Sequence, residues 1–170
     1  FMMHLIWSMR AACPELGDSA LSIIDESRDQ RARRRAVESL ANDMLDMLAG
    51  DAVLVIDDYQ SAARNPEIDD IIELLVDTMP PQMHVVLCTR QRPALGAMAR
   101  WRVKGDVLEI GEHDLAFADD EIAQLFASAY RIDLDAGKVR TIADLTEGWI
   151  IALEMMWHAL REGISIDDLL

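Results

Sequence analysis

Two adjacent carboxylates, Asp57 and Asp58, directly follow a run of five apolar residues at positions 52–56. Gly50 and Asp51 bound this run, which predicts a strand that is buried on both faces of a parallel sheet under helices. Ligands of such sheets bind at the carboxyl ends of the strands, where these two acids lie. Paired carboxylates there cost desolvation and mutual repulsion unless a cation neutralises them. We expect a magnesium ion carried by a nucleotide to be that cation.

A second apolar run, at positions 84–88, leads directly into Thr89 and Arg90. Because the carboxyl ends of parallel strands meet at one edge of a sheet, we expect these residues to lie near the two acids. In that arrangement Asp57 would hold Mg²⁺ through water and Asp58 would orient or polarise an attacking water, while Arg90 would reach the terminal phosphate. The alternative is a local Asp–Arg salt bridge in a purely structural sheet, and the residues alone leave it open.

Other catalytic motifs are missing from the 170 residues. No glycine of the chain begins or ends a GxxxxGK[ST] phosphate loop, which argues against catalysis by this chain alone. The four histidines show no zinc-ligand spacing, and the serines have no nucleophile-elbow context.

Composition narrows the classes of function. The 31 acidic residues outnumber the 16 basic ones, and the net charge of −15 argues against a nucleic-acid-binding surface on this segment. The two cysteines, Cys13 and Cys88, form no CxxC pattern, which favours a reduced, cytoplasmic setting. No apolar run approaches the roughly 20 residues of a membrane span, so we expect no membrane contact.

The elements that must position these residues alternate between helix and strand up to about residue 115. The Asn65-Pro66-Glu67 sequence predicts a helix start between the two strands, with Asn65 as the N-cap. The apolar spacing and breakers predict further elements: helices over 1–13, 20–24, 37–48 and 95–103, and a third short strand over 107–110. The fold class is therefore α/β, in a domain spanning residues 1–115.

Only helices are predicted in the remaining domain, residues 116–170. Asp119 or Asp120 is expected to cap its first helix and Asp135 its second. A third helix carries an apolar face that begins at Trp149 and ends before Gly163.

Several segments of the sequence resemble one family along nearly the whole chain. The segment from Leu54 to Gln60 is similar to the Walker B segment of LuxR-type, maltose-regulon-activator-like signal-transducing (STAND) P-loop NTPases. Residues 80–90 resemble the family's sensor strand with its preceding prolines. The Thr146-Glu147-Gly148-Trp149 sequence falls where related NTPases carry a Gly-x-Pro motif that touches adenine, with Trp149 in place of the proline.

This resemblance implies an ATP-dependent transcriptional regulator in which ATP binding and hydrolysis switch a resting monomer to an active oligomer. It assigns the catalytic role to Asp57 and Asp58, with Asp57 on Mg²⁺ through water, and nucleotide binding to Thr89, Arg90 and Trp149. The implied fold is a partial RecA/AAA-like P-loop NTPase sheet without its P-loop strand, followed by a small helical domain. ATP or ADP with Mg²⁺ is then the cofactor of the parent protein, and none is expected to bind tightly to the fragment.

The resemblance also implies which partners to expect. The P-loop strand and the winged-helix, sensor-repeat and DNA-binding domains have no counterpart in these residues, so the partner is the remainder of the regulator, and DNA is reached only through a domain absent here. Without the P-loop strand, 84–88 has an unpaired edge, which would either pair with 107–110 or drive self-association. The competing function is a non-catalytic protein–protein interaction or oligomerisation module. The family tends to have a threonine cap near Ala118, for which Asp119 is expected to substitute.

Overall fold

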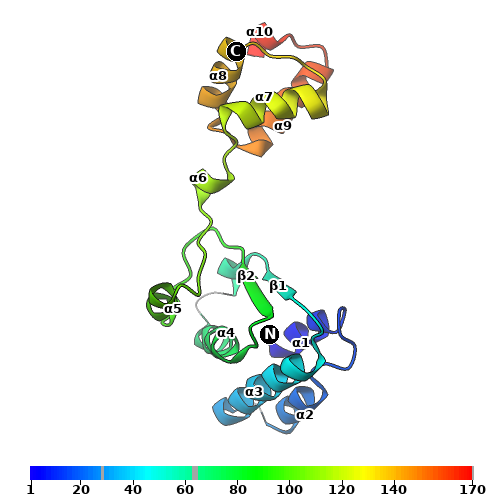
Figure 1. Ribbon diagram of the computed structural model, residues 1–170, viewed down its shortest axis with the longest axis vertical. Helices are drawn as coiled ribbons and strands as arrows, with labels where there is room; N and C mark the ends of the chain where they lie inside the picture. Colours follow the sequence, from blue (N-terminus) through cyan, green and yellow to red (C-terminus); the bar gives the residue numbers. More distant parts are fainter. Residues whose placement is uncertain (28, 63–64, 170) are drawn as a thin grey trace. The chain divides into compact units, whose positions relative to one another are not determined.

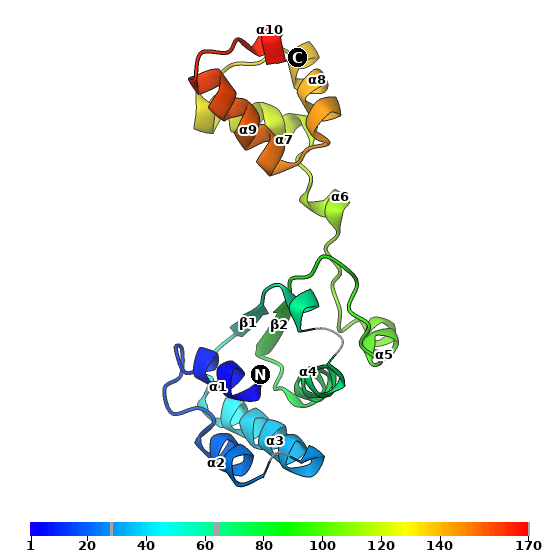
Figure 2. The same ribbon diagram turned by 180° about the vertical axis from the view of Figure 1, so that it is seen from behind.

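The computed structural model describes residues 1–27, 29–62 and 65–169, which form two compact units, 1–107 and 108–170 (Figures 1 and 2). The boundary predicted at residues 115 and 116 falls inside the second unit, directly after its first short helix. Each unit has its own hydrophobic core and is described by itself. No helix of the described ranges is long and apolar enough to cross a membrane.

The first unit combines helices with a small parallel sheet. Its elements are α1 (Met2–Met9), α2 (Asp18–Glu26), α3 (Gln30–Met47), β1 (Ala52–Ile56), η1 (Tyr59–Ser61, a single 3-10 turn), α4 (Pro66–Thr78), β2 (Met83–Leu87) and α5 (Met98–Lys104). The predicted α/β character of this part is confirmed at that level, as a mixture of helices with two parallel strands.

The sheet consists of β1 and β2, paired in parallel with Leu54 opposite Val85. One face packs on the helices, because Leu54 and Met83 belong to the same core as the apolar residues of α1 to α4. Figures 1 and 2 show α3 and α4 side by side next to the sheet. The crossover from β1 through α4 to β2 brings both strand ends to the same edge, as the sequence predicts.

Two expectations for the strands are wrong. The first strand is not buried on both faces, because Val53 is 60% exposed and Val55 57% exposed. Their side chains alternate with that of Leu54, and only the Leu54 face meets helices of the described residues. Residues 107–110 form no strand either: within the part of the chain that is described, β2 pairs only with β1, and Leu108 is 85% exposed. An extended segment needs a partner for its backbone groups to become a strand.

The local signals for α4 are confirmed in detail. Asn65 is the N-cap and its side chain accepts a hydrogen bond from the Glu67 N–H at 3.1 Å. Pro66 follows at the first helical position, where its missing N–H costs nothing. The apolar stripe of the helix then buries Ile71, Ile72 and Leu75 against the rest of the unit.

The second unit is helical, as predicted. Its elements are α6 (Glu112–Leu115), α7 (Asp119–Leu125), η2 (Phe126–Tyr130, a π-helical turn), α8 (Ala136–Thr146), α9 (Ile150–Arg161) and α10 (Ile166–Leu169). Its core is built on Ile122, Phe126, Ile142 and Leu153, none of which is measurably exposed. In Figure 1 this unit runs from yellow-green to red.

One predicted helix cap of this unit is confirmed and the other is wrong. Asp135 caps α8, where its side chain accepts the Lys138 N–H at 3.0 Å. Ala118, and not Asp119 or Asp120, occupies the N-cap position of α7. Alanine cannot accept a hydrogen bond through its side chain. Half of a capping box takes over, in which the Glu121 carboxylate accepts the Ala118 N–H at 2.9 Å.

Candidate functional site

The candidate site begins at the carboxyl end of β1, where Asp57 and Asp58 leave the sheet. Both side chains are exposed to solvent. Asp58 has a φ of +50°, in the left-handed region that aspartate tolerates better than most residues. Its N–H donates to Asp57 Oδ1 at 2.8 Å, so one oxygen of Asp57 fixes this turn. Within residues 1–27, 29–62 and 65–169, the second oxygen of Asp57 accepts no hydrogen bond.

Tyr59 anchors the turn that follows the two acids. Its side chain is only 1% exposed and its hydroxyl donates to Asp69 of α4. Its backbone N–H donates to the Cys88 carbonyl at 2.9 Å. This bond joins the segments that follow β1 and β2, just beyond the end of the sheet. Burial, and then the hydrogen bond to Asp69, raise the pKa of Tyr59 above its ordinary range. The acids therefore sit on a turn that is held from both sides.

Gln60 connects the ends of the two strands. Its Nε2 donates to Asp58 Oδ1 at 2.7 Å, and its Oε1 accepts the Arg90 N–H at 3.2 Å. Thr89 organises the same segment, because its hydroxyl donates to the Gln91 carbonyl at 2.9 Å. Asp58, Thr89 and Arg90 thus meet at one edge of the sheet. The sequence alone predicted no role for Gln60, because its partner Arg90 lies 30 positions away in the chain.

A cleft of about 600 Å³ opens beside this edge. Its lining comes from η1, from α4 and from the segment that follows β2: Tyr59, Gln60, Ser61, Asp69 and residues 89–94. Asp57 and Asp58 are not among these lining residues. The cleft therefore belongs to the Arg90 side of the site, and it offers guanidinium, hydroxyl and amide groups to a ligand.

The salt-bridge interpretation of these residues has no support in the geometry. Across residues 1–27, 29–62 and 65–169, no ion pair joins Arg90 to Asp57 or Asp58. The same ranges contain no cluster of three or more metal-ligating side chains. Because Mg²⁺ with a nucleotide is usually held by one or two carboxylates, phosphate oxygens and water, the exposed acids fit a water-mediated role better than a cage of protein ligands.

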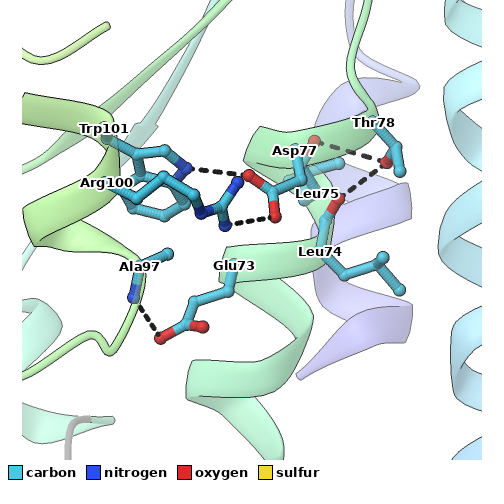
Figure 3. Close-up of polar contacts among 8 residues, drawn as sticks. All are labelled: Glu73, Leu74, Leu75, Asp77, Thr78, Ala97, Arg100 and Trp101. Carbon is cyan, nitrogen blue, oxygen red and sulfur yellow. Dashed lines mark hydrogen bonds and ion pairs between the residues drawn. The ribbon is translucent and has the colours of Figure 1, made fainter. Parts of the chain in front are cut away.

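A polar joint between α4 and α5 holds the segment that leaves the cleft (Figure 3). Asp77 accepts two hydrogen bonds, from Arg100 Nη2 at 2.7 Å and from Trp101 Nε1 at 2.8 Å. One turn earlier, Glu73 accepts the Ala97 N–H at 3.3 Å. The hydrogen bond from Arg100, followed by that from Trp101, lowers the pKa of Asp77, and the same contact raises the pKa of Arg100. No pattern in the sequence predicted this joint, because its partners lie 24 positions apart.

Trp149, the remaining predicted site residue, lies in the second unit and is not described relative to the other four. It is the N-cap of α9 and is 37% exposed. The preceding Gly148 has a φ of +74° and accepts the Phe117 N–H at 2.9 Å through its carbonyl. A Cβ on Gly148 would lie 2.5 Å from the Phe117 carbonyl oxygen, so only glycine fits this crossing.

Comparison with known proteins points to one kind of regulator. The chain is 34% identical over 112 residues to the HTH-type transcriptional regulator MalT from two strains of Klebsiella pneumoniae. The match covers 66% of this chain but only 12% of the length of those relatives. No protein-family model matches the chain. The similarity supports the family resemblance.

Proposed function

We propose that this chain is part of the ATP-binding regulatory switch of a bacterial LuxR-family, ATP-dependent transcriptional regulator of the signal-transducing P-loop NTPase group. The observation that carries the proposal is the meeting of Asp58 and the Thr89–Arg90 segment at the carboxyl ends of two adjacent parallel strands. Sites at such strand ends bind nucleotides in many α/β proteins. The 34% identity to the MalT regulators supports the same assignment.

Each predicted residue has a distinct role in this proposal. Asp57 would hold Mg²⁺ through water, and Asp58 would polarise the attacking water. Arg90 binds the terminal phosphate, with Thr89 ordering the same segment, and Trp149 stacks on the adenine. Bound Mg²⁺ would supply charge neutralisation on the phosphates. The 170 residues contain no GxxxxGK[ST] loop to cradle the β- and γ-phosphates, so we expect this chain alone to show no measurable hydrolysis.

The test is titration of Mg-ATP into the full-length protein, followed by calorimetry and by phosphate release. We expect the full-length protein to bind ATP, and Asp57→Ala to lose the magnesium-dependent part of binding and the hydrolysis. Asp51→Ala is the matched control, because it removes an exposed aspartate from the opposite end of the same strand. A full-length protein that neither binds nor hydrolyses ATP would overturn the proposal.

A second candidate function is a non-catalytic interaction or oligomerisation module. The observation that favours it is the exposed apolar face of the sheet, where Val53, Val55 and Val86 are 60%, 57% and 43% exposed. Exposed apolar patches and free strand edges recruit other chains. The same titration separates the two functions, because an interaction module predicts no response to Mg-ATP in either the wild type or Asp57→Ala.

A further inference from the structure

Gln60 is the only side chain that bonds both strand ends of the candidate site within the residues described. It lies in η1, two residues after Asp58, and its carboxamide reaches the Arg90 backbone at the end of β2. The other link across this edge, from the Tyr59 N–H to the Cys88 carbonyl, is backbone to backbone and touches neither acid. The contact between Asp58 and the Arg90 segment therefore depends on one amide group.

The neighbours of Gln60 determine which way its amide points. An ionised aspartate only accepts hydrogen bonds, so the NH₂ group must face Asp58. A backbone N–H only donates, so the amide oxygen must face Arg90. Both demands are met by one orientation and neither is met by the flipped one. A carboxamide is the only natural side chain of this length with a donor and an acceptor so arranged.

We propose that Gln60 is a positioning residue that couples the Asp58 carboxylate to the backbone of the phosphate-binding Arg90. The inference rests on the proposed function and adds to it the route between the two ends of the site. When Asp58 turns toward a water or a ligand, its bond to Gln60 weakens, and the Arg90 N–H loses a fixed acceptor. Conversely, an Arg90 segment that is ordered by phosphate holds Gln60, and through it the orientation of Asp58.

The first test needs no nucleotide and uses nuclear magnetic resonance on the 170-residue chain. The side-chain NH₂ signals of Gln60 should move toward those of a free carboxamide in Asp58→Ala, which removes their acceptor, and should stay in place in Asp51→Ala. In Gln60→Leu, exchange of the Arg90 amide hydrogen should become about two- to tenfold faster, which is the loss expected for one ordinary hydrogen bond. Unmoved NH₂ signals in Asp58→Ala, together with an unchanged exchange rate of the Arg90 amide in Gln60→Leu, would overturn the inference.

Gln60→Glu separates the two arms of the bridge, because glutamate keeps an acceptor for Arg90 but presents a carboxylate to Asp58. The two like charges repel each other and should loosen the bridge, so exchange of the Arg90 amide hydrogen should become faster than in the wild type. Gln124→Glu, at an exposed position in the second unit, controls for the added charge and should leave that exchange rate unchanged. The same rate in both variants would contradict the contact with Asp58.

The second test measures ATP hydrolysis by the full-length protein. Gln60→Leu should lower kcat by about tenfold or more with little change in KM, because a misplaced catalytic group affects the transition state more than binding. If the full-length protein does not bind ATP but the Gln60 signals change as expected, the proposed function is refuted, while the hydrogen bonds of Gln60 to Asp58 and Arg90 are supported. Wild-type kcat in Gln60→Leu, in a protein that does hydrolyse ATP, refutes the coupling role.

Discussion

Removal of the Asp77 carboxylate tests the joint between α4 and α5 that borders the candidate site (Figure 3). Asp77 accepts from Trp101 Nε1 and from Arg100 Nη2, but the two donors differ in environment. Trp101 is 4% exposed, so its indole N–H has no ready access to water. The Arg100 side chain is 47% exposed and would be solvated at once if its partner were lost.

This difference sets the size of the effect. In Asp77→Ala the buried indole N–H loses its acceptor, at a cost of about 1–3 kcal/mol, and the exposed ion pair adds about 0.2–1 kcal/mol. We therefore expect the free energy of unfolding of the first unit to fall by about 1–4 kcal/mol. Asp77→Asn keeps an acceptor for the indole and loses only the ion pair, so its cost should stay below about 1 kcal/mol.

Amide hydrogen exchange at the buried residues Ile72 and Leu75 of α4 measures this free energy without reporting on the second unit. The critical control is Trp101→Phe, which removes the indole N–H and keeps an aromatic ring. In that background Asp77→Ala should cost no more than the ion pair alone. Equal costs for Asp77→Ala and Asp77→Asn, or an unchanged cost of Asp77→Ala in the Trp101→Phe background, would refute the reasoning.

The same joint should respond to pH in one direction. Hydrogen bonds from Arg100 and Trp101 lower the pKa of Asp77 in the folded state. A carboxyl with a lowered folded pKa stabilises the fold above its unfolded pKa of about 3.9 and loses that contribution as pH falls through the folded value. The difference in stability between the wild type and Asp77→Asn should therefore be complete near neutral pH and shrink in acid.

Two further predictions use pairs of matched variants. Gly148→Ala should destabilise the second unit by about 1–2 kcal/mol more than Gly163→Ala in thermal unfolding. Both glycines have a positive φ, but only at Gly148 would a Cβ lie against the Phe117 backbone. Equal losses of stability would mean that the backbone contact between Gly148 and Phe117 can relax. Val55→Lys should abolish any concentration-dependent self-association seen by light scattering. The control is Val103→Lys, which should leave self-association unchanged, because Val103 lies on α5 and is 89% exposed. A chain that stays monomeric at all concentrations would contradict an oligomerisation role for the sheet face.

Local chemistry was enough to predict two of the helix caps and the strand pair. Asn65 and Asp135 cap their helices because a short polar side chain before an apolar period bonds the first free N–H groups, whatever the rest of the chain does. The parallel pairing of 52–56 with the second apolar run follows from a helix-length connection between two apolar runs, since a parallel pair needs such a crossover. That pairing in turn predicted that Asp58 and Arg90 would approach one edge.

Only the tertiary structure decided which surfaces are buried and which polar groups meet. A run of five apolar residues forms a strand whether helices pack on one face of the sheet or on both. The exposure of Val53 and Val55 therefore depended on how many helices cover the sheet, which the run alone does not specify. The Asp77–Trp101 contact and the Gln60 bridge join residues 24 and 30 positions apart. Hydrogen bonds of that kind require two side chains to be aimed within a few tenths of an ångström, and this aim is set by the packing of whole elements. The sequence by itself determined the chemistry available at the strand ends, and the fold determined how those groups are held together.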